Sequence, residues 1–226
     1  MLLLWKFFVL GFSALLPLVN PLGSALVFLG LVGNAPIDAY HSLARRVAIN
    51  TIIFLAVIEL VGSSLLSFFG ISLPIMQVSG GIVIAMIGWS LLNQQDSAPS
   101  AEKTTATEPV VTQSEIATLQ EKAFYPYTFP ITAGPGCIVV MLTLSVHAKE
   151  LTVTDTVLAH VGLFLAAVVL SASVYLCYAN APKIASKVSP STAHGILRVI
   201  AFILFCIGVQ IAWNGLNELL KTVLQR

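Results

Sequence analysis

Residues 7–29 read FFVLGFSALLPLVNPLGSALVFL, an apolar stretch that two prolines and an asparagine interrupt near its middle. A helix that crosses a lipid bilayer needs about 20 mainly apolar residues, and this stretch meets that length. The same criterion finds five more segments along the chain. The six predicted spans are 7–29, 47–69, 74–93, 124–146, 157–179 and 199–220.

The composition supports a membrane protein. Hydrophobic residues make up 57% of the 226 residues, charged residues only 9%, and the mean hydropathy is +0.93. A soluble domain carries about 25% charged residues, so a soluble enzyme and a disordered protein are both excluded. The net charge of +1 leaves no basic surplus for phosphates, so we expect no nucleic-acid partner. The expected surroundings are the lipid bilayer.

Basic residues set the expected orientation. The loops 30–46, 94–123 and 180–198 hold seven of the lysines and arginines, and the remaining segments hold four. Because cytoplasmic loops carry the excess of Lys and Arg, we expect these three loops in the cytoplasm. Both termini would then lie on the outer, periplasmic side of a multi-pass protein.

The segment 94–123 differs from the rest, since it is rich in Ser, Thr, Ala, Glu and Pro. Nothing in it could build a packed core, so we predict a flexible cytoplasmic linker. It divides the chain into a first three-helix repeat, 1–93, and a second, 124–226. A regulatory or partner-binding role for the linker stays an alternative.

The two halves share a pattern. Each opens with a span broken by P-x5-G, at Pro17–Gly23 and Pro130–Gly136, and each ends with an Ile-Gly pair, at Ile87-Gly88 and Ile207-Gly208. Two repeats with an odd number of spans must lie in the membrane with opposite orientation. The predicted fold is therefore all-α and integral to the membrane, with two inverted three-helix repeats whose helices 1 and 4 break near the midplane, as in many secondary transporters.

The breaks have a chemical interpretation. Asn20 and Gly134 can each cap a new half-helix whose first residue is a proline, Pro21 or Pro135. Under inverted topology both half-helix N-termini face the membrane centre, where their N–H groups suit a carboxylate. Proline kinks that are structural only are the alternative. The predicted substrate-binding residues are Asn20, Pro21, Gly23, Thr132, Gly134, Pro135 and Gly136.

Glu59 is the one acidic residue well inside a predicted span. A carboxylate in hydrocarbon is costly, so we expect it to face the bundle interior. It could couple proton movement, or only bond to a neighbouring helix. We expect no basic residue deep in another span to pair with it. His160, Gln210 and Asn214 are predicted to hydrogen-bond between helices, with lining of the pathway as the alternative.

Enzymatic chemistry is not expected. The sequence contains no HExxH or CxxC motif and no serine in a recognisable nucleophile elbow. The cysteines, at 137, 177 and 206, lie in apolar stretches and are predicted to be buried in the membrane as small apolar residues. We predict no metal and no cofactor.

Several of these motifs resemble the MarC family of bacterial inner-membrane proteins. The similarity lies in Asn20–Gly23, in Phe129–Gly136, in Phe68–Ser72 followed by Gly80-Gly81, and in the closing segment from Arg198 to Gly215. It covers nearly the whole chain except the linker. The resemblance implies a bacterial inner membrane and six spans with both termini outside. It also implies, for some members, transport of small neutral amino acids.

The leading hypothesis is a secondary transporter of a small solute, with neutral amino acids as the expected class. A passive channel or exporter and a membrane protein without transport are the alternatives. The sequence leaves open the substrate, the direction of transport, the coupling ion and whether the chain forms a homo-oligomer.

Overall fold

The computed structural model describes residues 1–33, 35–93, 118–148, 152–187 and 190–224, and these ranges contain helices and no strand. The all-helical class predicted from the sequence is therefore confirmed. Most of the predicted linker, 94–117, lies outside the described residues. The elements are α1 (Leu2–Val19), α2 (Pro21–Val32), α3 (Ile37–Phe68), α4 (Leu73–Asn93), the irregular helix η1 (Ala123–Thr132), α6 (Pro135–His147), α7 (Val153–Ala179), α8 (Ala181–Lys187) and α9 (Pro190–Leu224).

Five helical stretches within the described ranges are long and apolar enough to cross a membrane. η1 and α6 give a sixth if the two, bent by 70°, count as one span. The five are Leu2–Val32, Ile37–Phe68, Leu73–Asn93, Val153–Ala179 and Gly195–Thr222. The bundle is thus that of a multi-pass membrane protein.

Several helices extend beyond the predicted spans. α3 begins at Ile37, ten residues before the predicted start at 47, and includes the charged Asp38, Arg45 and Arg46. A hydropathy criterion stops where charges begin, but the helix continues because its backbone hydrogen bonds need no hydrocarbon around them. Glycines mark two helix ends: Gly33, after α2, has φ 65° and Gly70, after α3, has φ 67°. Only glycine adopts this backbone without strain.

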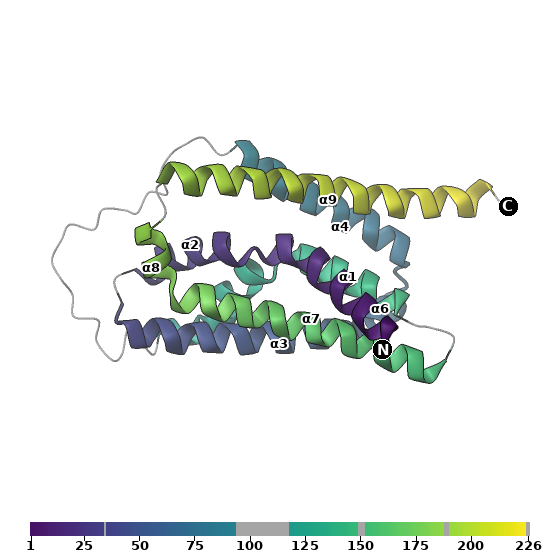
Figure 1. The fold of residues 1–226 in the computed structure, drawn as a ribbon. Coiled ribbons are helices and arrows are strands. Elements are labelled where there is room, and N and C mark those ends of the chain that lie inside the picture. Colours follow the sequence, from purple (N-terminus) through teal and green to yellow (C-terminus); the bar gives the residue numbers. More distant parts are fainter. Residues whose placement is uncertain (34, 94–117, 149–151, 188–189, 225–226) are drawn as a thin grey trace.

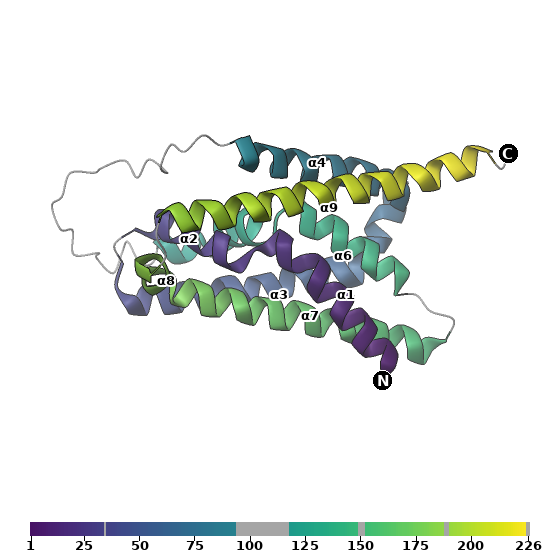
Figure 2. The same cartoon turned by 45° about the horizontal axis from the view of Figure 1, so that its top comes forward.

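The helices form two layers. α4 and α9 lie side by side as one antiparallel pair, while α1, α2, α3, α6 and α7 form the larger layer (Figure 1). The start of α1 and the end of α9 lie at the same end of the bundle, which we call the terminal end (Figures 1 and 2). α8 and the end of α2 lie at the opposite end, called the loop end.

Small residues bring α4 and α9 close. A Cβ on Gly81 would lie 2.6 Å from the Gly208 carbonyl oxygen, and a Cβ on Gly208 would lie 2.7 Å from that of Gly81. Such close backbone approach is typical of helix pairs in membranes. The close approach is thus reciprocal between Gly81 and Gly208. Both helices carry the pattern G-x3-A-x2-G, from Gly81 to Gly88 and from Gly208 to Gly215.

The buried core lies in the larger layer. Leu15, Phe28, Leu55, Tyr127 and Tyr178 belong to one cluster, contributed by α1, α2, α3, η1 and α7. In contrast, large apolar side chains of α9 such as Phe202 and Trp213 are exposed. Exposed apolar surface on this scale suits hydrocarbon rather than water.

Candidate functional site

Asn20 separates α1 from α2. Its backbone is left-handed, with φ 42° and ψ 68°, and its N–H donates to the Leu16 carbonyl, which closes α1. Its side-chain Oδ1 accepts the Gly23 N–H at 3.1 Å, and so caps α2. Asparagine tolerates the left-handed region better than other side chains, and Pro21, with no N–H to satisfy, follows at the first helical position. The sequence Asn-Pro thus ends one helix and starts the next.

The second interruption lies at Ala133 and Gly134. Before it, two threonine hydroxyls donate to backbone carbonyls of the irregular η1: Thr128 to Ala123 at 2.7 Å and Thr132 to Tyr127 at 2.6 Å. After it, α6 starts at Pro135, with Gly134 in extended conformation as its cap. α6 runs from this point towards the terminal end, whereas α2 runs towards the loop end (Figure 2).

The fold brings the two interruptions together. A Cβ on Gly136, in the first turn of α6, would lie only 2.7 Å from Leu18 in the last turn of α1. From α7, the Tyr178 hydroxyl donates to that of Thr132 at 2.7 Å, since the Thr132 proton goes to the Tyr127 carbonyl. The Tyr178 ring stacks on Phe28 of α2. One tyrosine therefore contacts both interrupted spans.

Sequence reasoning missed Tyr178. It lies in the last turn of α7, where a tyrosine is expected as an interfacial residue whatever its role. In the structure it is fully buried, and its ring stacks on Phe28 with centroids 4.3 Å apart. Tyr178 follows His160 by 18 residues, or five helical turns, so both lie on one face of α7. This spacing indicates a buried position only once the packing of α3 and η1 on that face is known.

The glycines next to the interruptions contact protein atoms. A Cβ on Gly23 would meet the Asn20 side chain and approach Leu197 of α9 at 2.9 Å, and one on Gly136 would meet Leu18 and Ile84. In this conformation both glycines therefore allow close packing.

In the first turns of α2 and α6, some N–H groups already donate hydrogen bonds within the chain. The Ser24 N–H donates to the Asn20 carbonyl and the Cys137 N–H to that of Gly134, both at 2.9 Å. The Gly23 N–H is bonded to the Asn20 side chain, and both helix starts carry a partial positive charge. Among the predicted residues, Pro21, Gly23, Thr132 and Gly136 are buried, and Asn20, Gly134 and Pro135 are half-buried.

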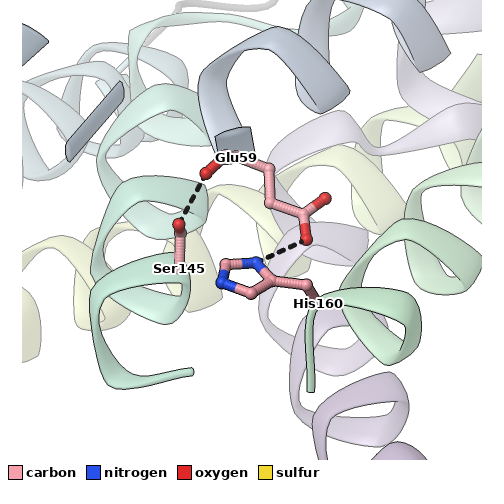
Figure 3. A network of polar contacts seen from close by, with 3 residues as sticks. All are labelled: Glu59, Ser145 and His160. Carbon is pink, nitrogen blue, oxygen red and sulfur yellow. Dashed lines mark hydrogen bonds and ion pairs between the residues drawn. The ribbon is translucent and has the colours of Figure 1, made fainter. Parts of the chain in front are cut away.

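Glu59 is part of a separate polar cluster (Figure 3). Its side chain is 2% exposed, and its Oε1 lies 3.1 Å from Nδ1 of His160 on α7. Its backbone carbonyl accepts the Ser145 hydroxyl of α6 at 2.6 Å. The prediction that His160 hydrogen-bonds between helices is confirmed, because the antiparallel packing of α3 on α7 brings it beside Glu59.

This cluster lies away from the two interruptions. Ser145 is ten residues after Pro135, which corresponds to about 15 Å along α6. The predicted proton-coupling residue and the predicted substrate-binding residues therefore do not share one pocket. Gln210 and Asn214, both expected between helices, instead bond to each other at 2.9 Å on the exposed side of α9.

Comparisons with known proteins place these features in a family. Residues 5–220 match the family described as MarC family integral membrane protein. The chain is 30% identical over 222 residues to the UPF0056 inner membrane protein MarC of Salmonella typhimurium, covering 97% of this chain and 98% of that protein. It is 31% identical over 226 residues to the protein of that name from Escherichia coli O1:K1 / APEC, covering 98% and 99%. No solved structure matches significantly.

Proposed function

Because the chain is a multi-pass inner-membrane protein that belongs to the MarC family, we propose that it is a secondary transporter of a small solute, with neutral amino acids as the substrate class. The observation that carries the proposal is that the two interruptions, at Asn20 and at Ala133-Gly134, lie together inside the bundle, where Leu18 packs against Gly136. Discontinuous helices that start at such a point are typical of transporter binding sites. It is not proposed to be an enzyme.

The contacts between helices support an inverted repeat. In the proposed arrangement, the α1–α2 span corresponds to η1–α6, α3 to α7, and α4 to α9. Exchanging the halves turns the observed packing of α1 and α2 on α7 into that of η1 and α6 on α3, which is also observed. The α3–α7 and α4–α9 contacts map onto themselves. The reciprocal contact of Gly81 and Gly208 fits a two-fold axis through the α4–α9 pair.

The solute would bind where the two spans are interrupted. Its carboxylate would be held by the positive ends of α2 and α6, and the hydroxyls of Thr132 and Tyr178 would offer hydrogen bonds to its ammonium group. Since Leu18 and Ile84 pack against Gly136, binding requires these side chains to withdraw. Glycines and prolines surround the interruptions, at Pro21, Gly23, Gly134 and Pro135, and such small residues favour glycine or alanine over larger amino acids.

Glu59 would couple transport to protons together with His160. A carboxyl group and an imidazole 3.1 Å apart can share a proton, and both change charge by gaining or losing one. The pair joins α3 to α7, the two helices on which both interrupted spans pack. A protonation change there would alter the packing on both sides of the site.

The test is uptake of labelled glycine and alanine into proteoliposomes, with and without a proton gradient. We expect saturable uptake that unlabelled solute on the opposite side accelerates. A passive channel would show flux that does not saturate and no such counter-exchange. No flux in either direction, across a panel of small zwitterions and anions, would contradict the proposal and favour a membrane protein without transport.

A further inference from the structure

A mainly apolar cleft with several polar side chains in its lining opens at the terminal end of the bundle, between α1, α4, α6 and α9. Its volume is about 690 Å³, and it lies between the two helix layers. Most of the surface of α4 and α9 is apolar, but here amides, a hydroxyl and charges of both signs gather. The polar residues that line it include Lys6, Gln77, Thr143, His147, Asn214 and Glu218.

The inner part of the cleft is formed by Gln77 and Thr143. Gln77 is only 7% exposed, and its Nε2 lies 3.5 Å from the Thr143 hydroxyl, the outer limit of a hydrogen bond. A side-chain amide offers two N–H donors and an acceptor oxygen, and this contact uses one donor. A buried amide at the floor of a cleft can therefore still bind a polar solute.

The seam between α4 and α6 leads from this floor towards the helix interruptions. The helices run antiparallel, with Gln77 beside Thr143, Gly80 beside Val139, and Ile84 beside Gly136. Thr143 and Gly136 are seven residues apart, or about 10 Å along α6. The cleft thus points at the proposed binding site and ends about two helical turns before it.

Apolar side chains close these two turns. Val139 fills the space that Gly80 leaves, so a Cβ on Gly80 would clash with it. Ile84, Val139 and Leu204 are 1%, 6% and 7% exposed and form one cluster, against which Leu18 packs. A polar solute in this cluster would lose its hydrogen bonds to water and gain none from these side chains. The seam is therefore closed to such a solute in this conformation.

We propose that the cleft is the aqueous entrance of the solute path, with Gln77 and Thr143 as the first binding position for a small zwitterion and Val139 with Ile84 as the closed gate. Lys6 and Glu218 at the cleft supply charges for the two ends of such a solute. Opening requires α4 to move away from α6, and α9 moves with α4 because their backbones interlock at Gly81 and Gly208. The inference rests on the proposed transport function.

Cysteine accessibility tests the entrance without requiring transport. In a background with Cys137, Cys177 and Cys206 replaced by alanine, Thr143→Cys, Val139→Cys and Ile84→Cys are made singly and exposed in spheroplasts to a membrane-impermeant trimethylammonium methanethiosulfonate. We expect Thr143→Cys to react at least about ten-fold faster than the other two, because a thiol buried in apolar surroundings rarely ionises. Equal rates at the three positions would overturn the proposal.

Two exposed positions serve as controls for the side of the membrane. Ser72→Cys lies at the terminal end and should react, while Asn93→Cys at the opposite end of α4 should be protected. If Asn93→Cys reacts and Ser72→Cys is protected, the terminal end faces the cytoplasm. The reaction rates at the three cleft positions are then compared in inside-out vesicles, and the same ten-fold difference is expected. The lipid-facing Val83→Cys should stay unreactive on either side.

A second variant tests the gate itself. Val139→Ala, added to Ile84→Cys, should raise the reaction rate at Ile84→Cys by about ten-fold, because it opens the seam at Gly80. An unchanged rate would contradict the assignment of Val139 as a gate residue. If the accessibility order holds but no solute is transported, the proposed function fails and the water-filled cleft remains. If the protein transports solute but the three cysteines react at equal rates, the proposed entrance is contradicted while the proposed transport function stands.

Discussion

The Tyr178 hydroxyl lies 2.7 Å from the Thr132 hydroxyl, and through this contact α7 reaches the interruption between η1 and α6. Phe28, on the other interrupted span, stacks on the ring of the same tyrosine. A single side chain thus contacts both interrupted spans. If the solute binds there, the phenol is well placed to contact it.

Replacing Tyr178 with phenylalanine tests this contact. Tyr178→Phe keeps the stacking on Phe28 but removes the hydroxyl, so we expect KM for glycine or alanine to rise about ten-fold, as for a lost hydrogen bond worth about 1.4 kcal/mol. Initial uptake rates in proteoliposomes measure it. Tyr175→Phe is the matched control, since Tyr175 is on the same helix and packs on His41 instead. Equal KM values for the two variants would separate Tyr178 from the binding site.

The left-handed backbone at Asn20 predicts an order of stability. Asn20→Ala loses the cap on Gly23 and places an alanine at φ 42°, so it should destabilise the protein by about 2 kcal/mol. Asn20→Gly loses only the side chain and should cost a few tenths of a kcal/mol. Thermal unfolding in detergent compares the three proteins. Equal melting temperatures for the alanine and glycine variants would show that the backbone conformation is not needed.

The α4–α9 pair depends on its glycines. Gly81→Val and Gly208→Val each place a side chain against the opposite backbone, and each should destabilise the protein by about 3 kcal/mol or prevent its accumulation. Gly30→Ala is the control, because nothing lies within 4 Å of a Cβ there. Protein abundance in membranes and thermal unfolding provide the measurement. Stable valine variants would disprove the close backbone contact between the two helices.

The Glu59–His160 pair predicts a loss of coupling without loss of binding. Glu59→Gln keeps a hydrogen-bonding partner for His160 but cannot release a proton, so accumulation driven by a proton gradient should be lost while counter-exchange continues. His160→Asn should behave in the same way. The assay compares gradient-driven uptake with exchange in the same proteoliposomes. Gradient-driven accumulation that survives in Glu59→Gln would leave the pair a structural role only.

Much of the fold could be predicted from the sequence, because hydrocarbon imposes a simple requirement on length and polarity. The length of the apolar stretches predicts the spans and the all-helical class. The preference of proline for the first position of a helix predicts the new helices that start at Pro21 and Pro135. Helix ends were predicted less well. Charges at the start of α3 lie beyond the hydrophobic stretch, and no local signal says that the helix continues through them.

The tertiary contacts could not be predicted. Glu59 and His160 are 101 positions apart, so their pairing depends on how α3 packs on α7. The reciprocal contact of Gly81 with Gly208 also depends on how α4 packs on α9, and the sequence does not show it. Tyr178 and the cleft beside Gln77 were missed because polar residues near helix ends are common in membrane proteins.

The central claim is that a small zwitterion binds where the two interrupted spans meet, and a structure with bound glycine or alanine tests it most directly. We predict that the solute carboxylate lies between the starts of α2 and α6, near Pro21 and Pro135, with Leu18 and Ile84 withdrawn from Gly136. A solute bound elsewhere, with Leu18 still packed on Gly136, would contradict the account.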